Sequence, residues 1–372
     1  MLSFASAIFQ FATPRATHTQ GRSQPTLRGV ISALSTAAAV LAATPSHAEG
    51  AGRLFFIEPA NGHIVTGAVN RNGQFVKELD GDFLSEAGRD VVVPVAAGAL
   101  IYNSFAGGGQ EFVLDGNARY TFGSSSPFSA QWFYTIGLGE YVFFYDLNGD
   151  TSQGALVQFS PNGTFTQTYT AHTFSPWSLV APTDNSLFFY NKTTGLLSTA
   201  TISVTGQLSQ NGAAATIGSG YTNLAAAGDD VLLFNFHNGA WESGLLNFVG
   251  GSTPQTYTRA VVHATDTLGL SGMDEAVAID GRLLVYNSAT GAAMLGHFQR
   301  VGGSTPAGAF IKDTNLTLPK FFTNLMRAGE FLVFYSLGTG EMQIGYLDLS
   351  GAYHQTEDFN FGIGFSAMVS SQ

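Results

Sequence analysis

A short apolar segment that ends in a polar turn recurs seven times along the chain. The successive copies lie 45, 43, 45, 44, 52 and 49 residues apart, and each ends on a large apolar or aromatic residue. These last residues are Ile57, Tyr102, Tyr145, Tyr190, Phe234, Tyr286 and Tyr335. A continuous apolar run of this length, bounded by turn residues, predicts a strand that is covered on both faces.

Turn residues follow each apolar segment at fixed distances. Glycine stands five positions after the last residue in six copies, at Gly62, Gly107, Gly195, Gly239, Gly291 and Gly340. Asparagine or aspartate follows directly in five copies, at Asn103, Asp146, Asn191, Asn235 and Asn287. Glycine accepts positive φ angles and asparagine bonds its own backbone in turns, so each strand is predicted to turn back within its own sheet.

A second recurrent strand precedes most copies and begins with a large apolar residue. These residues are Trp132, Trp177, Tyr221, Met273, Phe322 and Phe365. A period of 40–50 residues that holds four short strands is typical of a β-propeller blade. The sequence therefore predicts an all-β, seven-bladed propeller built from four-stranded antiparallel blades.

The two ends of the repeat array predict how the ring is completed. The first apolar strand, 54–57, has no inner strand before it, and the chain ends on a strand of the inner type at 365–369. Pairing of these terminal strands would complete the seventh blade and leave no open sheet edge. The two longest repeats share Val-Gly-Gly-Ser-Thr-Pro at 249–254 and 301–306, which predicts an extended loop between the third and fourth strands.

The first 48 residues have the organisation of a secretory signal. Arg15, Arg22 and Arg28 precede a small-residue apolar run at 29–43, and Ser46-His47-Ala48 offers a cleavage site. The run is short for a membrane span and is followed by polar residues. We therefore expect a signal peptide over 1–48, a single propeller domain over 49–372, and a secreted or periplasmic location.

Charge restricts the partners of the mature domain. Removing the three arginines of 1–48 leaves 12 basic against 26 acidic residues, a net charge near −14. Such an acidic surface disfavours nucleic acid and anionic membranes. The chain has no cysteine, so its stability comes from packing rather than from disulfides.

Two repeated sets of side chains are candidates for ligand binding. The aromatic set could stack on sugar rings or pack between blades, and the asparagine set could bond sugar hydroxyls or close turns. The candidate ligand-binding residues are Trp132, Trp177, Tyr221, Phe322, Asn191, Asn235 and Asn287.

Signals for metal binding and catalysis are few. Asp146, Asn148 and Asp150 gather oxygen ligands as a Ca²⁺ loop would, without the distal glutamate of an EF-hand. Asp274 and Glu275 place two acids in the inner strand of one unit, where acid–base chemistry at the axis is conceivable. The sequence has no G-x-S-x-G motif, P-loop or zinc motif.

The ring residue, apolar pair, short turn and LFF strand together resemble the repeats of tachylectin-2-type propeller lectins and of exported bacterial propellers. The resemblance covers about a third of the mature chain, and those lectins have five blades. It implies a secreted, non-catalytic carbohydrate-binding protein with repeated sites and glycan partners. Two alternatives stay open: a propeller lyase or hydrolase with one axial polar site, and a scaffold for other proteins.

Overall fold

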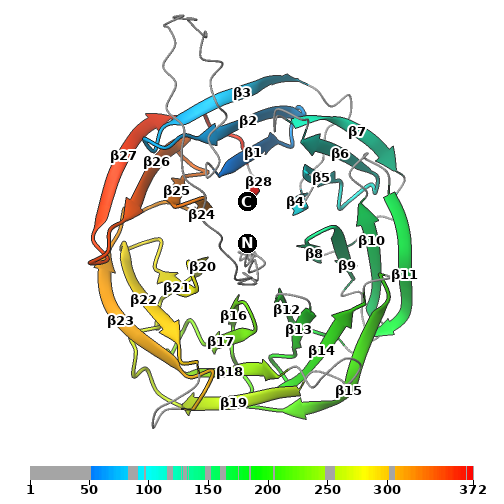
Figure 1. Cartoon of the computed structure of the whole chain (residues 1–372), viewed down its shortest axis with the longest axis vertical. Helices are drawn as coiled ribbons and strands as arrows, with labels where there is room; N and C mark the ends of the chain where they lie inside the picture. Colours follow the sequence, from blue (N-terminus) through cyan, green and yellow to red (C-terminus); the bar gives the residue numbers. More distant parts are fainter. Residues whose placement is uncertain are drawn as a thin grey trace, which may run out of the picture.

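The chain folds into seven four-stranded antiparallel sheets, as seen in a computed structural model. The structure describes residues 52–82, 91–95, 98–114, 120–126, 128, 132, 134–146, 152–159, 165–174, 176–183, 186–203, 206–247, 256–300, 306–365 and 367–371. The sheets are arranged as blades around a central axis, so the predicted seven-bladed propeller is confirmed (Figure 1). The expected signal peptide lies outside the described residues.

The strands of each blade are ordered from the axis outward. The innermost strands are β4 (Val91–Val95), β8 (Tyr134–Leu138), β12 (Leu179–Pro182), β16 (Asn223–Ala227), β20 (Glu275–Ile279), β24 (Asn324–Ala328) and β28 (Ala367–Ser371). The second strands are β1 (Arg53–Glu58), β5 (Gly98–Tyr102), β9 (Tyr141–Tyr145), β13 (Ser186–Tyr190), β17 (Asp230–Phe234), β21 (Arg282–Tyr286) and β25 (Phe331–Tyr335). The third strands are β2 (His63–Val69), β6 (Gly109–Leu114), β10 (Ser152–Phe159), β14 (Leu196–Ile202), β18 (Trp241–Asn247), β22 (Ala292–Phe298) and β26 (Glu341–Leu347). The outer strands are β3 (Phe75–Asp82), β7 (Tyr120–Ser126), β11 (Phe165–Phe174), β15 (Leu208–Thr216), β19 (Thr256–His263), β23 (Phe310–Thr317) and β27 (Tyr353–Asn360).

We number the blades by these sheets, starting with the one that holds β1. Blade 1 has the order β28-β1-β2-β3, and blades 2 to 7 follow in chain order from β4–β7 to β24–β27. The antiparallel pairing of β28 with β1, which places Phe55 opposite Val369, is the one expected between the two terminal strands.

The hydrophobic core lies between blades rather than within any one of them. Seven buried clusters occur, and each combines side chains from two neighbouring blades, including blades 7 and 1. Each second strand contributes side chains to the clusters on both of its faces. In β1, Leu54, Phe55, Phe56 and Ile57 are all fully buried. Their continuous apolar pattern follows from this coverage on two faces.

Among the described residues, a tyrosine hydroxyl also ties five of the seven pairs of neighbouring blades, and these hydroxyls belong to Tyr102, Tyr145, Tyr190, Tyr286 and Tyr335. The Tyr145 hydroxyl of blade 3 accepts the backbone N–H of Trp177 at 2.7 Å, where the chain enters blade 4. In blades 6 and 7 the hydroxyls of Tyr286 and Tyr335 donate to the carbonyls of Pro319 and Gly362, at 2.5 and 2.6 Å. The tyrosines at the ends of the second strands therefore fix the loops that lead into the next blade.

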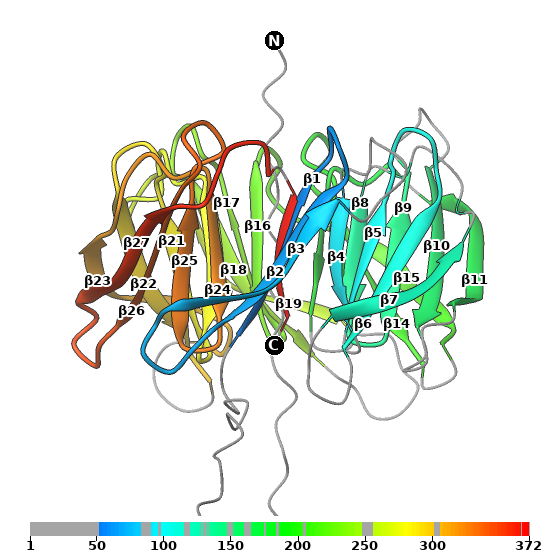
Figure 2. The same ribbon diagram turned by 90° about the horizontal axis from the view of Figure 1, so that it is seen from above.

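Two sets of connections share one face of the ring. Innermost strands begin, and second strands end, at the face drawn uppermost in Figure 2, which we call the upper face. The turns between second and third strands and the loops between blades therefore lie together on it. The predicted extended loops fall between β18 and β19 and between β22 and β23, at the opposite face, and most of their residues lie outside those described.

Candidate functional site

The structure places the candidate aromatic residues in the packing between blades. Trp177, Tyr221 and Phe322 are only 1 %, 5 % and 3 % exposed, and Trp132 is half-buried against Phe144 at 6.0 Å between ring centroids. They stand two residues before the innermost strands that they were expected to begin. Rings covered in this way serve as inter-blade contacts, and their faces are closed to a sugar.

The candidate asparagines form the turns of the upper face. The side-chain oxygen of Asn191 accepts the N–H groups of Thr193 and Thr194 at 3.0 Å, and its Nδ2 donates to the carbonyl of Pro176 at 2.6 Å. Asn235 and Asn287 donate in the same way to Gly220 and Gly272. Both ends of each amide are thus used to join a turn to the loop entering the same blade.

Asp274 makes a turn contact that recurs on the upper face. Its Oδ1 accepts the N–H of Ser288 at 2.8 Å, and its Oδ2 accepts the Ser288 hydroxyl. Thr222 and Thr323 occupy the same place in blades 5 and 7 and accept the corresponding N–H groups, from Phe236 at 2.8 Å and Leu337 at 2.9 Å. Asp274 therefore replaces a threonine in a turn contact.

Glu275 is the residue of this region that the repeat does not explain. It is the first residue of β20, opposite Tyr286, at the upper end of an innermost strand. No hydrogen bond from another described residue reaches its half-buried carboxyl group. Burial, with a smaller contribution from the Asp274 charge, raises the pKa of Glu275 well above its ordinary value. An ionisable group held in this state at the mouth of a ring is a candidate for acid–base chemistry.

Among the residues that correspond to Glu275 in the other blades, only those of blades 5 and 7 carry a side-chain amide. Asn223 and Asn324 flank Glu275 in blades 5 and 7, where Thr222 and Thr323 donate to their Oδ1 atoms at 2.7 and 2.9 Å. The other blades carry Val91, Tyr134, Leu179 and Ala367 at this position. We call Asn223, Glu275 and Asn324 the axial arc. At this position, side-chain amide and carboxyl groups are thus confined to three adjacent blades.

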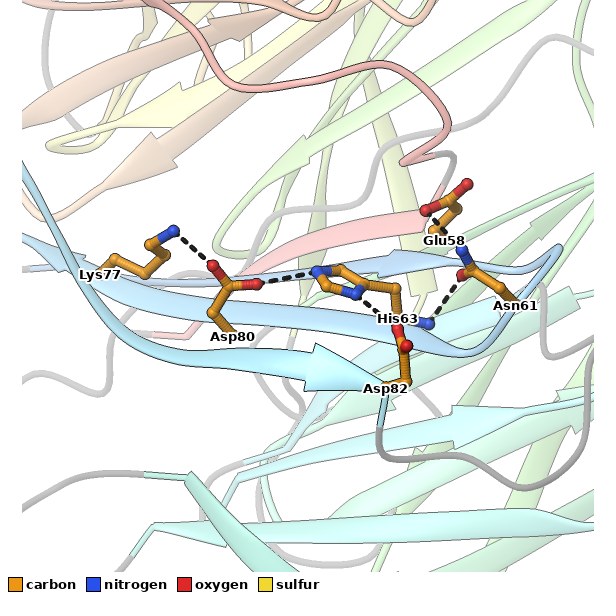
Figure 3. Close-up of polar contacts among 6 residues, drawn as sticks. All are labelled: Glu58, Asn61, His63, Lys77, Asp80 and Asp82. Carbon is orange, nitrogen blue, oxygen red and sulfur yellow. Dashed lines mark hydrogen bonds and ion pairs between the residues drawn. The ribbon is translucent and has the colours of Figure 1, made fainter.

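A second polar group lies farther out on the upper face, in blade 1 (Figure 3). His63, at the start of β2, contacts Asp82 through Nδ1 at 2.7 Å and Asp80 through Nε2 at 2.8 Å, and Lys77 pairs with Asp80. Burial lowers the pKa of His63, but the hydrogen bonds to Asp82 and Asp80 outweigh burial and raise that pKa overall. With both ring nitrogens engaged, His63 has no free nitrogen with which to accept a proton from a substrate.

One further acid is buried without a partner. Glu111 of β6 is fully buried, and neither carboxyl oxygen has a hydrogen-bond partner among the described residues. Burial raises its pKa to about 7. It lies in the middle of a third strand, away from both faces of the ring, so it is distinct from the axial arc.

The proposed calcium loop falls mostly outside the described residues. Asp146 follows β9, and its backbone N–H bonds to the carbonyl of Gln153 at 2.9 Å, whereas Asn148 and Asp150 are not described. Within the described part of the chain, no group of three histidine, aspartate or glutamate residues is placed to hold a metal ion. A search of the same part for a helix that could cross a membrane also finds none.

The comparisons with known proteins rest on shape alone. No protein-family profile matches the sequence, and no curated protein sequence matches it. The fold is similar to a proposed 6-phosphogluconolactonase from Bacteroides fragilis (TM-score 0.62, 14 % identity, 88 % of this chain and 100 % of that one). It is also similar to a proposed 6-phosphogluconolactonase from Bacteroides uniformis (0.63, 11 %, 87 % and 100 %). The periplasmic gluconolactonase of Pseudomonas aeruginosa is a third such structure (0.59, 12 %, 87 % and 99 %).

These findings correct the functional expectations drawn from the sequence. The expected kinship with tachylectin-type lectins is not supported, because the solved propellers that match this chain over almost their whole length include three that carry lactonase names. The expectation of a non-catalytic protein that binds glycans as its partners is overturned by the same finding.

Proposed function

We propose that this protein is a hydrolase of the lactonase type that acts on sugar lactones at the upper, axial end of the ring. The observation that carries the proposal is Glu275, an acid without a hydrogen-bond partner among the described residues, at an axial position between those of Asn223 and Asn324. The lactonase names of the propellers with this shape support the choice of substrate class.

The chemistry needed for lactone hydrolysis matches the axial arc. The Glu275 carboxylate would take a proton from water as the water oxygen attacks the lactone carbonyl carbon. The bond from that carbon to the ring oxygen then breaks, and the ring oxygen leaves as a hydroxyl with the transferred proton. The product is an open-chain hydroxy acid, so atoms and charge balance without a further reactant.

The flanking asparagines suit the developing negative charge on the carbonyl oxygen. Thr222 and Thr323 donate to the Oδ1 atoms of Asn223 and Asn324, which orients each amide and leaves its Nδ2 hydrogens as the donors for a ligand. Donors fixed in advance stabilise an oxyanion more effectively than water that must reorient.

The raised pKa of Glu275 has a direct consequence for the pH profile. A general base acts in its ionised form, so activity should fall as the pH drops through the Glu275 pKa. Because burial raises this pKa, the acid limb should lie above the range of an ordinary glutamate.

The test is the release of acid from glucono-1,5-lactone by the purified protein, measured above the spontaneous rate. Glu275→Gln should lower kcat by about 100-fold or more, as expected on removal of a general base. Asp80→Asn, which removes an exposed carboxylate of the His63 group, is the matched control and should stay within about twofold of the parent. Parent protein no faster than buffer, or Glu275→Gln as active as the parent, would refute the proposal.

A further inference from the structure

Phe321 stands at a position that holds glycine in blades 5, 6 and 1 and proline, Pro176, in blade 4. The residue three positions before the innermost strand has a positive φ in four blades: 90° at Gly220, 81° at Gly272, 102° at Gly364 and 70° at Phe321. The first two donate their N–H to the turn of the preceding blade, and Phe321 makes the same bond to the Ser288 carbonyl at 2.6 Å. A bulky side chain is rare in this left-handed region, since its Cβ is crowded by the following backbone.

The fold gains no packing from this aromatic residue. Phe321 is 67 % exposed, and a Cβ added at the equivalent Gly220 would meet no atom within 4 Å. The Phe321 side chain is therefore exposed on the upper face, whereas a Cβ at Gly272 or Gly364 would lie 2.9 Å from Asn287 Nδ2 or 2.8 Å from Glu58 Oε1. Strained residues that persist without a packing reason are concentrated at ligand-binding and active sites.

Phe321 is connected to the axial arc by a short chain of contacts. Its N–H bonds to Ser288, Ser288 bonds to Asp274, and Asp274 precedes Glu275. The loop that carries it is tied on its other side by Tyr286, whose hydroxyl donates to Pro319. The backbone of Phe321 is thus tied to the turn that Asp274 holds, and Asp274 is the neighbour of Glu275 in the sequence.

Lys320 adds a second element to this surface. Its Nζ lies 5.0 Å from the centroid of the Phe321 ring, a cation–π contact that covers one ring face. The large exposure of Phe321 leaves the remaining ring surface open. An exposed aromatic face at the same end of the ring of blades as Glu275 suits a ring-shaped ligand with apolar C–H groups on one side.

We propose that Phe321, supported by Lys320, is the platform on which the ring of the substrate stacks, and that it makes the axial site selective for cyclic lactones over open-chain analogues. This inference rests on the proposed function for the reaction, but the platform can be tested by binding alone. A ring that is absent from the equivalent loops of blades 5, 6 and 1 would thus confine substrate binding to one sector of the upper face.

The binding experiment uses calorimetry with two unreactive probes, cyclic gluconolactam and open-chain gluconamide. The parent protein should bind the lactam more tightly, and Phe321→Gly should weaken lactam binding about tenfold while leaving gluconamide within about twofold, because stacking on an aromatic face is lost. Phe321→Tyr should keep the preference. The midpoint of thermal unfolding of Phe321→Gly should stay level or rise, since glycine is native to the equivalent positions. Leu349→Ser, which removes an exposed apolar residue of a turn at the opposite face, is the control.

The outcomes separate this inference from the proposed function. Hydrolysis by the parent, with unchanged lactam binding and unchanged KM for glucono-1,5-lactone in Phe321→Gly, overturns the platform and leaves the hydrolase in place. Lactam binding that depends on Phe321 without any hydrolysis supports the platform and overturns the hydrolase. Equal binding of lactam and gluconamide by the parent overturns the platform whatever the activity.

Discussion

The His63 group of blade 1 and the axial arc of blades 5 to 7 use charged residues in opposite ways. In the first, every charge faces an opposite one: His63 lies between Asp80 and Asp82, and Lys77 pairs with Asp80. In the second, Glu275 has no such partner among the described residues, and its nearest charge is the like charge of Asp274. Both groups lie on the upper face, so location alone does not distinguish structure from function. The presence or absence of partners does.

The same comparison extends to a second acid without a partner among the described residues, Glu111, and predicts the largest effect on stability. Its folded pKa of about 7 exceeds the usual value of 4.5, so the stability it contributes is present below pH 4.5 and is lost as the pH rises toward 7. At about 1.4 kcal/mol per pKa unit, the loss is about 3 kcal/mol. Glu111→Gln should abolish this loss and be more stable than the parent at pH 8, relative to pH 4, by about that amount.

Urea unfolding at pH 4 and pH 8 measures this difference directly. Glu330→Gln, which changes an exposed glutamate of a turn, is the control and should shift the free energy of unfolding by less than about 0.5 kcal/mol at either pH. A parent protein whose stability relative to Glu111→Gln does not change between the two pH values would show that Glu111 has a partner beyond the described residues.

Substitutions at Asp274 and at Glu275, its neighbour in sequence, should change the free energy of unfolding in opposite directions. Asp274→Ala removes the acceptor of the Ser288 N–H and should cost about 1–2 kcal/mol of unfolding free energy. Asp274→Thr should restore most of it, since threonine fills this place in blades 5 and 7. Glu275→Gln should instead raise the free energy of unfolding at pH 8. The raised pKa of Glu275 means that its ionised form destabilises the fold above that pKa, and the substitution removes this charge.

Thermal unfolding of the three variants at pH 4 and pH 8 provides the measurement. The stabilising effect of Glu275→Gln should vanish at pH 4, where the acid is protonated in both folded and unfolded protein. If Glu275→Gln destabilised the protein at pH 8 as much as Asp274→Ala does, Glu275 would be a structural residue and the contrast between the neighbours would fail.

The smallest effect is expected in the His63 group. The raised pKa of His63 means that its ion pairs add stability below pH 6.5 and that this contribution is lost as the pH rises through the folded pKa. Because the pairs are partly exposed, His63→Gln should cost less than about 1 kcal/mol at pH 5.5. The cost should be close to zero at pH 8.5. His237→Gln, at an exposed turn histidine, is the control, and equal costs at both pH values for His63→Gln would contradict the assignment.

Much of the fold could be predicted because the sequence repeats its structural signals in register. The apolar second strands, the glycines five residues on and the period of 43–52 residues reflect a packing unit covered on two faces. The start of the innermost strands was misjudged by two residues, because residues such as Trp177 and Tyr221 are held by a tyrosine of the previous blade rather than by strand pairing. That contact joins residues of different repeats, which a pattern within one repeat does not contain.

The candidate site was only partly predictable. Asp274 and Glu275 stood out as acids, but the sequence did not show that Asp274 caps a turn while Glu275 is left without a partner. The partnership of Asn223 and Asn324 with Glu275 depends on strand register and on the meeting of three blades at the axis. Phe321 could have been found, since an alignment of the repeats places it against Gly220 and Gly272.

The pairing of β1 with β28 has a consequence for the order of events during synthesis. Phe55 emerges from the ribosome more than 300 residues before Val369, the residue it faces in the finished sheet. Contacts between such distant residues form slowly, because a long loop must be closed first. The first blade therefore lacks its innermost strand until the whole chain has been made. The inner edge of β1 is unpaired for that entire period, and an unpaired strand edge can pair with other chains. We therefore expect that the final pairing of β28 with β1 occurs after synthesis, and that a chaperone covers the edge until then.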